Sequence, residues 1–325
     1  MLPSPLNTEI ESLIVVSCEA GGAQILSSLI KNRKFYKKVS FYLQGPAIQI
    51  FKAKLGNIDV LSDLSIIESL GKKDFVLVGR SLMCDIEKEA TKKANKFHIP
   101  NGVFLDHWVN FDSFYMPTAI KNKKDELQYY MPMHVFVGDD YAYDIAEKLY
   151  GDIVILESNE YFKDIAKQAA ALHINAKADY LLFITDPLSI DNKILNNNIK
   201  VFGFDEYDVL RDIFEYMDVA GGRRIQKVVV RPHPNHSEDE LRRNIFNKIN
   251  IPDDIELIVD KGTDLIEQMM SAAVIVGIES VALVIAKMIH RPTYSYVPKY
   301  GTKKIIFTDK QIQKVRDLSI IEEFI

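Results

Sequence analysis

Residues 13–22 read Leu-Ile-Val-Val-Ser-Cys-Glu-Ala-Gly-Gly, and they decide how the chain begins to fold. The first five residues form an apolar run with the length of a buried strand, and the two glycines follow it as a turn signal. A helix is expected to start near Ala23. A strand, a glycine turn and a helix in this order are typical of a βα unit.

The same succession recurs along the whole chain. Most of the apolar runs do not alternate with polar residues, which is typical of parallel strands covered by helices on both faces. Segments with apolar residues at spacings of three and four predict helices over Cys84–Phe97, Asn159–Leu172 and Glu206–Met217. The predicted strands are Leu13–Ser17, Val39–Leu43, Phe75–Val78, Gly102–Leu105, His134–Val137, Ile153–Leu156, Tyr180–Thr185, Ile199–Phe202, Val228–Arg231, Ile255–Val259, Val274–Gly277 and Thr293–Val297.

The length of 325 residues suits about two domains of ~150 residues each. Alternating βα units over that length predict an α/β protein with two doubly wound, Rossmann-like domains. The polar connector His173–Asp179 places the boundary near residue 175, so the expected domains are 1–175 and 176–325. Two such domains facing each other leave a cleft at the carboxyl ends of both sheets, where open α/β folds bind ligands. A last helix is expected from about Asp309.

Composition narrows the class of protein. Forty Lys and Arg against forty-five Asp and Glu give a net charge of −5, which argues against nucleic-acid binding by bulk charge. Only two cysteines occur, and the N-terminus has no basic region typical of a signal peptide, so a cytoplasmic protein is expected. The apolar segment 272–289 has the length of a membrane span. Glu279 near its middle would cost roughly 2–3 kcal/mol there, so a strand, a turn and a helix are expected instead.

Glu19, Gly21 and Gly22 follow the first predicted strand. Glycines there let backbone N–H groups approach a ligand at a helix N-terminus. The stretch has neither the dinucleotide-binding glycine pattern nor the lysine of a phosphate-binding loop. A cleft loop that contacts the acceptor and a plain βα turn without a ligand both remain open.

Asp106 and His107 stand at the end of another apolar strand, beside Trp108, the only tryptophan. A carboxyl group next to a large apolar ring tends to have a raised pKa, which suits a general base. His107 would orient the substrate or carry charge. The alternative is a helix cap at Asp106 and a buried, hydrogen-bonded His107.

Two further strand ends suggest phosphate binding. Arg231 and His233 end one strand with prolines around the histidine, and rigid donors of this kind suit a phosphate. Gly277, Glu279, Ser280 and Val281 end another strand and open a helix. The free N–H groups at its start form an anion site, and Glu279 would accept hydrogen bonds from ribose or base hydroxyls. The alternatives are a structural turn at Arg231 and a simple N-cap at Ser280.

Other polar stretches have simpler interpretations. His236 is expected to cap a helix near Ser237, and Thr263-Asp264 to open another. Asp139-Asp140 suggests a metal, but no neighbouring cluster has the spacing of metal ligands, so no metal is expected. The basic run 31–38 is typical of a solvated helix end, and it would also suit peripheral contact with an anionic membrane surface.

Two of these stretches together resemble a known group of enzymes. Arg231-Pro232-His233-Pro234, followed by Gly277-Ile278-Glu279-Ser280 and the run to Arg291-Pro292, resembles the C-terminal half of GT-B glycosyltransferases. The closest likeness is to bacterial sialyltransferases and Kdo transferases that carry an "HP" motif and use CMP-activated acidic sugars. Leu105–Asn110 looks like a motif of capsule and surface-polysaccharide transferases of that kind. The likeness covers both halves in layout, but residues match only in these three stretches.

The resemblance implies a role for each matching residue. His233 would bind the donor phosphate, Ser280 would assist it, and a carboxylate of the first domain would be the base. Such sialyltransferases present the base in an acidic pair followed by glycine, whereas here Gly138 precedes Asp139-Asp140. We therefore assign the base to Asp106.

The implied reaction is an inverting transfer of an acidic sugar from a CMP-activated donor to a surface glycan or glycolipid. A single phosphate leaves with CMP, so His233, Arg231 and a helix dipole can meet its charge without a metal or another cofactor. A UDP-sugar transferase and a nonhydrolysing sugar-nucleotide epimerase have the same two-domain layout and remain alternatives. An alternative of another class is a non-catalytic nucleotide-sugar-binding or scaffold protein of a capsule assembly complex.

Overall fold

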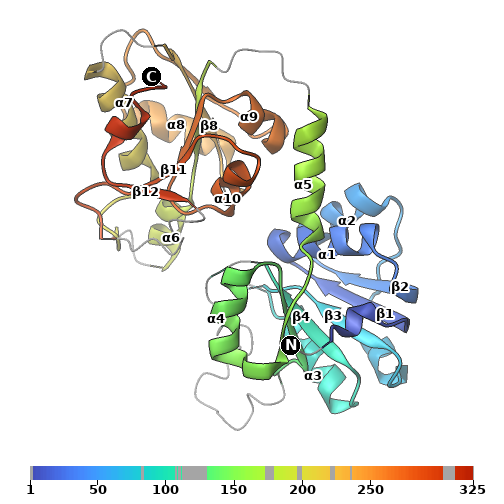
Figure 1. Cartoon of the computed structure of the whole chain (residues 1–325). Helices are drawn as coiled ribbons and strands as arrows, with labels where there is room; N and C mark the ends of the chain where they lie inside the picture. The colour runs from blue at the N-terminus through green and yellow to red at the C-terminus, as the bar shows by residue number, and fades with distance from the viewer. Residues whose placement is uncertain are drawn as a thin grey trace. The chain divides into compact units, whose positions relative to one another are not determined.

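The structure is a computed structural model that describes residues 3–81, 84–106, 108, 111, 130–172, 179–195, 200–219, 224–234, 236–302 and 312–324. Contacts within the chain divide it into two units, unit 1 (Met1–Asp164) and unit 2 (Ile165–Ile325) (Figure 1). Each unit contains one six-stranded sheet. The boundary predicted near residue 175 lies outside the described residues.

The sheet of unit 1 is parallel, with the strand order β2-β1-β3-β4-β5-β6. Strands β3 and β4 are buried along their whole length, as their apolar sequences predict. The strands are β1 (Ile10–Ser17), β2 (Tyr36–Leu43), β3 (Phe75–Val78), β4 (Asn101–Leu105), β5 (His134–Val137) and β6 (Val154–Leu156).

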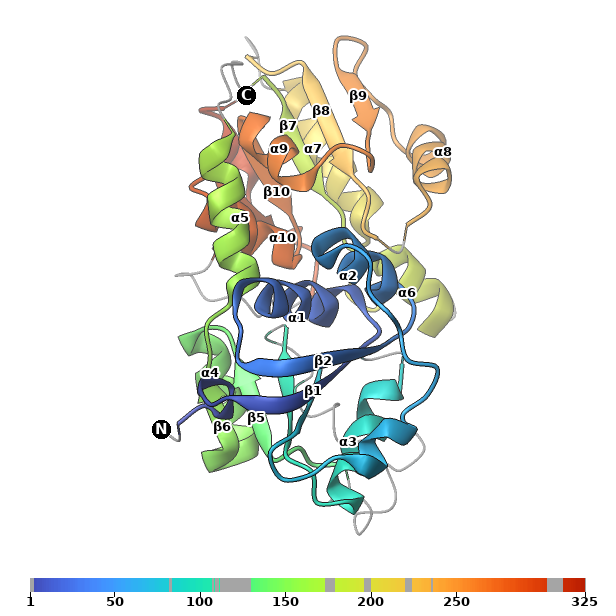
Figure 2. The ribbon, with the colours of Figure 1, turned by 90° about the vertical axis from the view of Figure 1, so that its right-hand side faces the viewer.

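Helices cover both faces of this sheet, with α1 and α2 on one face and α3 on the other (Figure 2). Helix α1 forms because Ile25, Leu26, Leu29 and Ile30 recur at helical spacing, and all four are buried in the core of the unit. The helices of unit 1 are α1 (Ala20–Asn32), α2 (Ala47–Leu55), α3 (Ile86–Lys96) and α4 (Asp140–Tyr150), with 3₁₀ turns at Pro5–Asn7, Ser65–Ser69 and Gly151–Ile153. Helix α5 (Glu160–Ala171) begins in unit 1 and continues into unit 2.

A single parallel bridge joins Phe41 of β2 to Val60. Because β1 occupies the other edge of β2, Val60 extends the order to Val60-β2-β1-β3-β4. This is the 3-2-1-4-5 order of a Rossmann fold with its third strand reduced to one bridge. The strand order reverses between β1 and β3, and we call this position the switch point of unit 1.

The sheet of unit 2 is also parallel and, read from β9, has the order β9-β8-β7-β10-β11-β12. This is the complete 3-2-1-4-5-6 order, and its switch point lies between β7 and β10. The strands are β7 (Leu181–Ile184), β8 (Lys227–Arg231), β9 (Glu256–Val259), β10 (Val274–Gly277), β11 (Thr293–Tyr296) and β12 (Gln313–Val315). Both units therefore confirm the predicted Rossmann-like fold class.

The core of unit 2 lies between this sheet and its helices. Phe183 of β7 and Phe214 of α7 are fully or almost fully buried in it, together with Phe204 just before α7. The helices are α6 (Leu188–Leu195), α7 (Glu206–Val219), α8 (Glu238–Lys248), α9 (Leu265–Ser271) and α10 (Val281–Met288), with a 3₁₀ turn at Leu318–Ile321.

Two predictions about unit 2 were wrong. Residues 200–202, the described part of the predicted strand Ile199–Phe202, do not form a strand; Val201 is half exposed, and Lys200 pairs with Asp205. The helix expected from about Asp309 is absent from residues 312–324, which form the edge strand β12 and a 3₁₀ turn instead. Both errors concern short segments, where pairing with a neighbour decides the structure more than local composition.

The segment 272–289 forms β10, a turn and α10, as predicted. Among the helices of the described residues, none combines the length and the apolar character needed to cross a membrane.

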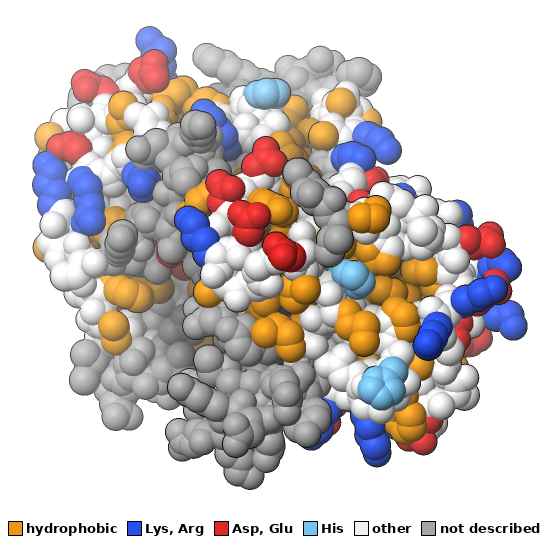
Figure 3. Space-filling view, turned by 60° about the horizontal axis from the view of Figure 1, so that its bottom comes forward, with side chains coloured by type: hydrophobic (Ala, Val, Ile, Leu, Met, Phe, Trp, Pro, Cys, Tyr) orange, Lys and Arg blue, Asp and Glu red, His pale blue; other side chains and the backbone are white. Residues whose placement is uncertain are grey.

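Charges of both signs occur on the face drawn in Figure 3. The basic run 31–38 falls at the end of α1 and the start of β2, and part of its charge is compensated. Arg33 pairs with Glu157 at 2.6 Å, and Lys37 pairs with Glu11 at 2.7 Å. These ion pairs reduce the positive charge that the run offers to a membrane surface.

Candidate functional site

The switch point of unit 1 brings together two loops. The loop after β1 contains Cys18 and Glu19, and α1 then begins at Ala20. The loop after β3 contains Arg80 and Ser81. Both loops lie at the carboxyl edge of the sheet, where open α/β folds place their ligands.

Glycines allow these segments to approach closely. A Cβ atom on Gly22 would lie 3.0 Å from the backbone nitrogen of Arg80, and one on Gly21 would overlap Oδ2 of Asp106. Because α1 begins at Ala20 rather than near Ala23, both glycines lie in its first turn, which corrects the sequence-based position of the helix. The space beside them is filled by protein atoms of Asp106 and Arg80. Their predicted role in a cleft loop stays a prediction.

Asp106 directly follows β4, and its side chain is 15% exposed. Arg80 Nη1 lies 3.6 Å from Asp106 Oδ1, an ion pair too long for a normal hydrogen bond. Oδ1 is buried and has no hydrogen-bond partner among the described residues. A buried carboxylate oxygen without a hydrogen-bond donor is costly in its charged form, and this cost favours the protonated carboxyl.

Burial raises the pKa of the Asp106 carboxyl and outweighs the lowering effect of Arg80, while the negative charge of Glu19 raises it further. The predicted cause was the ring of Trp108. That ring is buried, but its Nε1 donates to Asp139 Oδ2 at 2.9 Å. The sequence thus predicted the direction of the pKa shift but attributed it to the Trp108 ring, whereas burial of the carboxyl and the charge of Glu19 raise the pKa. His107 lies outside the described residues.

Asp139 is the N-cap of α4, and its Oδ1 accepts a hydrogen bond from the backbone nitrogen of Ala142 at 2.8 Å. Both of its carboxylate oxygens are therefore bonded within the protein, because Trp108 donates to the other. Asp140 is exposed at the start of the helix. Within the described ranges, no group of three or more His, Cys, Asp or Glu side chains could hold a metal ion. This geometry favours Asp106 over Asp139 as a base.

Sequence reasoning missed Glu87, the second residue of α3. Its side chain is almost completely buried, at 1% exposure, and burial raises its pKa to about 7. It lies on the same helical face as the buried residues Ala90, Thr91 and Ala94. A carboxylate on the apolar face of a predicted helix was the available signal, because such groups are seldom buried without a function or a partner.

The switch point of unit 2 contains the predicted stretch Gly277–Val281. A Cβ on Gly277 would lie 2.9 Å from the carbonyl oxygen of Ile184, so the glycine lets β10 approach β7. Ser280 caps α10 and accepts from the backbone nitrogen of Ala282 at 3.3 Å, and Val281 is the first helical residue.

Asp186, which follows β7, was also missed by sequence reasoning. Its Oδ2 accepts from the backbone nitrogen of Glu279 at 3.0 Å. A protein carboxylate therefore holds one of the N–H groups near the predicted anion site. The signal available in the sequence was its position just after a central apolar strand.

Arg231 lies at the end of β8, but its guanidinium is engaged within the unit. Nη1 donates to the carbonyl oxygen of Thr263 and, at 3.0 Å, to Oε1 of Gln268. These contacts match the structural alternative, in which Arg231 ties β8 to the start of α9. Its predicted contact with a phosphate remains a prediction. The cap predicted just before α9 is confirmed, because Asp264 accepts from the backbone nitrogen of Ile266.

His233 is held by its backbone nitrogen, which donates to Thr185 Oγ1 at 2.8 Å. Burial, with the nearby His236 and Lys261, lowers the pKa of His233 to about 4, so its imidazole is neutral at neutral pH. A neutral ring still offers one N–H donor. It does not supply the positive charge that phosphate binding was expected to use.

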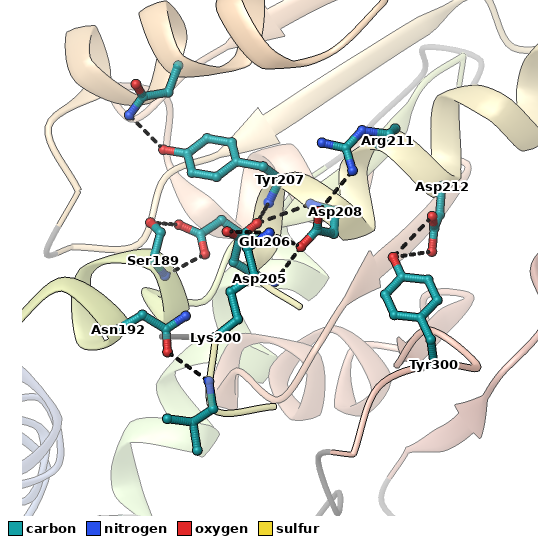
Figure 4. Close-up of polar contacts among 12 residues, drawn as sticks. Ser189, Asn192, Lys200, Asp205, Glu206, Tyr207, Asp208, Arg211, Asp212 and Tyr300 are labelled. Carbon is teal, nitrogen blue, oxygen red and sulfur yellow. Dashed lines mark hydrogen bonds and ion pairs between the residues drawn. The ribbon is translucent and has the colours of Figure 1, made fainter. Parts of the chain in front are cut away.

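The predicted helix cap at His236 was wrong, because Ser237 caps α8. The buried His236 ring instead lies 3.0 Å from Glu206 Oε1 and 3.2 Å from Thr185 Oγ1. Glu206 also accepts from the backbone nitrogen and the hydroxyl of Ser189 (Figure 4). Two members of this network, Ser189 and His236, line a pocket of about 280 Å³ between α6 and α8. Both ring nitrogens of His236 and both carboxylate oxygens of Glu206 have partners within this network.

The structure thus brings Glu19, Gly21 and Asp106 together in unit 1. It places Gly277, Glu279, Ser280 and Val281 along the connection from the end of β10 to the start of α10, and Arg231 and His233 at the end of β8.

No family model matches the chain, and no curated protein matches its sequence. The chain is similar to the UDP-GlcNAc 2-epimerase of Methanocaldococcus jannaschii in complex with UDP-GlcNAc and UDP, with a TM-score of 0.55, 15% identity, and 87% of this chain and 83% of that chain covered. It is similar to S. aureus MnaA bound to UDP, with a TM-score of 0.54, 14% identity, and coverage of 88% and 79%. It is also similar to the Neisseria meningitidis UDP-GlcNAc 2-epimerase bound to UDP-GlcNAc, with a TM-score of 0.52, 13% identity, and coverage of 87% and 82%. At these identities the likeness concerns the fold alone, and the chain has the fold of two Rossmann-like domains, of GT-B type, that these proteins share.

Proposed function

We propose that this chain is an enzyme that acts on a UDP-linked sugar, with Asp106 as its base. The observation that carries the proposal is the Asp106 carboxyl group. It lies beside the switch point of unit 1, burial raises its pKa, and its Oδ1 has no hydrogen-bond partner among the described residues. Perturbed carboxyl groups at such positions are typical of proton-transfer sites.

The nucleotide is proposed to be UDP because solved structures with this fold hold UDP or UDP-GlcNAc. An epimerase must remove and return a proton at one sugar carbon, and a transferase must take a proton from an acceptor hydroxyl. Both reactions need a base whose pKa is close to the working pH. Asp106 suits either reaction, so the proposal covers both.

Unit 2 would bind the nucleotide at its switch point. The N–H group of Val281 at the start of α10 and the neutral imidazole of His233 are donors suited to phosphate oxygens, whereas the N–H of Ala282 already donates to Ser280. Glu279 would accept hydrogen bonds from the ribose hydroxyls. Arg231 has a smaller part in this proposal than the sequence predicted, because its guanidinium bonds to Thr263 and Gln268.

A second candidate is transfer of an acidic sugar from a CMP-activated donor to a surface glycan. One observation favours it: the Arg231-Pro232-His233-Pro234 stretch and Ser280 stand at the carboxyl ends of β8 and β10, on either side of β7. A CMP leaving group carries one phosphate, and the same donors could meet its charge without a metal.

Isothermal titration calorimetry with UDP, CMP, GDP and ADP, with and without EDTA, tests the proposal. We expect UDP to bind most tightly, with an affinity that EDTA does not change. Tightest binding of CMP would favour the second candidate. Binding of a nucleotide without turnover of any nucleotide sugar would favour the scaffold alternative, and binding of none would overturn all three.

A further inference from the structure

Glu87 occupies a central place at the switch point of unit 1, yet the proposed function has not used it. The residue belongs to the first turn of α3, and its carboxyl group is buried against the loops that follow β1 and β3. No cation is paired with it among the described residues, and its Oε2 has no hydrogen-bond partner there. Burying a carboxyl group with one unbonded oxygen reduces the stability of the folded state. The hydrogen bonds of its other oxygen must offset this cost.

That other oxygen joins the two loops. Oε1 of Glu87 accepts from the backbone nitrogen of Cys18 at 2.8 Å and from Ser81 Oγ at 2.6 Å. Ser81 Oγ in turn accepts from the backbone nitrogen of Glu19 at 3.3 Å. The carboxyl and the hydroxyl together hold two successive N–H groups of the β1 loop against the β3 loop.

Both loops lead directly to Asp106. Arg80, next to Ser81, forms the ion pair with Asp106. Glu19 precedes α1, whose Gly21 lies against the Asp106 carboxyl, and the charge of Glu19 acts on that carboxyl. A shift of either loop would therefore change the charges and the packing around Asp106.

We propose that Glu87 is a positioning residue. Its carboxyl group fixes the β1 loop to the β3 loop and so sets the geometry of Arg80, Glu19 and Gly21 around Asp106. This inference rests on the proposed role of Asp106 as the base. Glu87 acts through the loops and does not itself touch the substrate.

Hydrogen exchange of individual backbone amides tests the contact without any assay of activity. Glu87→Met keeps the volume of the side chain but removes the acceptor, so the amides of Cys18 and Glu19 should exchange roughly fivefold faster or more. Ser81→Ala should release Glu19 and leave Cys18 protected. Glu87→Gln keeps an acceptor oxygen and should restore most of the protection at both amides.

Glu89→Ala is the matched control, because Glu89 is exposed on the same helix and lies two residues from Glu87. It should change neither amide. Unchanged protection of Cys18 in Glu87→Met would overturn the proposal. If Glu87→Met does not fold, Ser81→Ala decides through the amide of Glu19.

Turnover of the nucleotide sugar tests the consequence. Glu87→Met should lower kcat roughly 10–100-fold and leave nucleotide affinity within about twofold of wild type, because a displaced catalytic group affects the chemical step. Glu87→Gln should recover most of kcat. Released amides with an unchanged kcat would overturn the positioning role alone, whereas a wild-type chain without any turnover would overturn the proposed function and leave the exchange result standing.

Discussion

The two switch points have the same topology but treat their acidic groups differently. In unit 1, Asp106 and Glu87 are buried beside the loops after β1 and β3, and burial raises the pKa of both. In unit 2, Asp186 accepts a backbone hydrogen bond, and Glu206 is bonded to Ser189 and His236. This difference matches the proposed function, in which unit 1 supplies the base and unit 2 binds the nucleotide.

A carboxyl group whose partners leave one oxygen unbonded retains a driving force to take up a proton. A carboxylate with complete hydrogen bonding loses that driving force and becomes a fixed part of the scaffold. The same Rossmann-like fold can therefore carry a base in one domain and a passive binding surface in the other.

The largest effect is expected from Asp106→Asn, which keeps the size of the side chain but cannot accept the proton. Turnover should fall by ~10²–10⁴, the usual contribution of a general base. Nucleotide affinity should stay constant, because the proposed phosphate contacts come from unit 2. The melting temperature should be equal or higher, because Asn removes the cost of burying a charge.

Asp140→Asn is the control for that variant, since Asp140 is exposed and lies at the start of α4. Near-normal turnover of Asp106→Asn would show that another residue is the base. It would also contradict the proposed difference between the two units.

The second prediction concerns how the free energy of unfolding depends on pH. Glu87 in unit 1 and His233 in unit 2 should make this free energy change with pH in opposite directions. The pKa of Glu87 is raised from 4.5 to about 7. Its protonated carboxyl therefore stabilises the folded state at low pH, and this stabilisation is lost as the pH rises from 4.5 through 7. The pKa of His233 is lowered from 6.5 to about 4, so its contribution is lost as the pH falls from 6.5 through 4.

Glu87→Gln removes the first of these titrations. Relative to wild type, the free energy of unfolding of this variant should rise by about 2–3 kcal/mol between pH 5 and pH 8, because each unit of pKa shift corresponds to about 1.4 kcal/mol. Glu19 and Cys18 face the same carboxyl and remain in both proteins. Urea unfolding at several pH values measures the difference, and parallel curves would show that Glu87 does not titrate in this range.

Gly21→Ala tests the packing around Asp106. A Cβ at this position would overlap Asp106 Oδ2. The end of a side chain can move aside, so we expect a change in stability within about 1 kcal/mol, since alanine also favours the helix. The displaced carboxyl should lower turnover roughly tenfold.

The comparison variant is Gly71→Ala, where the nearest atom to the new Cβ would be Asp74 Oδ2 at 3.8 Å. It should have wild-type turnover. Equal turnover in both variants would show that the contact between Gly21 and Asp106 has no part in catalysis.

The smallest effect is expected from His233→Ala. The imidazole is neutral above pH 5, so it offers one uncharged hydrogen bond, worth about 0.5–1.5 kcal/mol. Nucleotide affinity should fall by roughly three- to tenfold, equally at pH 6 and pH 8. His290→Asn, at an exposed histidine of unit 2 with a φ of 61°, which asparagine tolerates, is the control. A loss that grows toward pH 6 would show that His233 binds in its charged form.

The sequence by itself determined most of the local structure. The predicted bounds of Phe75–Val78, His134–Val137 and Val274–Gly277 agree residue for residue with β3, β5 and β10. The caps at Asp264 and Ser280 were also predictable. Apolar runs, helical spacing and capping residues act over a few neighbouring positions, so one stretch of sequence contains all the information they need.

The chemistry of the sites was decided by tertiary structure. Arg231 was predicted to face a phosphate, but Gln268, 37 positions away, accepts its hydrogen bond. Glu87 contacts Cys18 across 69 positions, and Asp106 lies against Gly21 and Arg80. The pKa and the hydrogen bonding of a side chain depend on which distant groups surround it and exclude water from it, and only the folded chain brings those groups together.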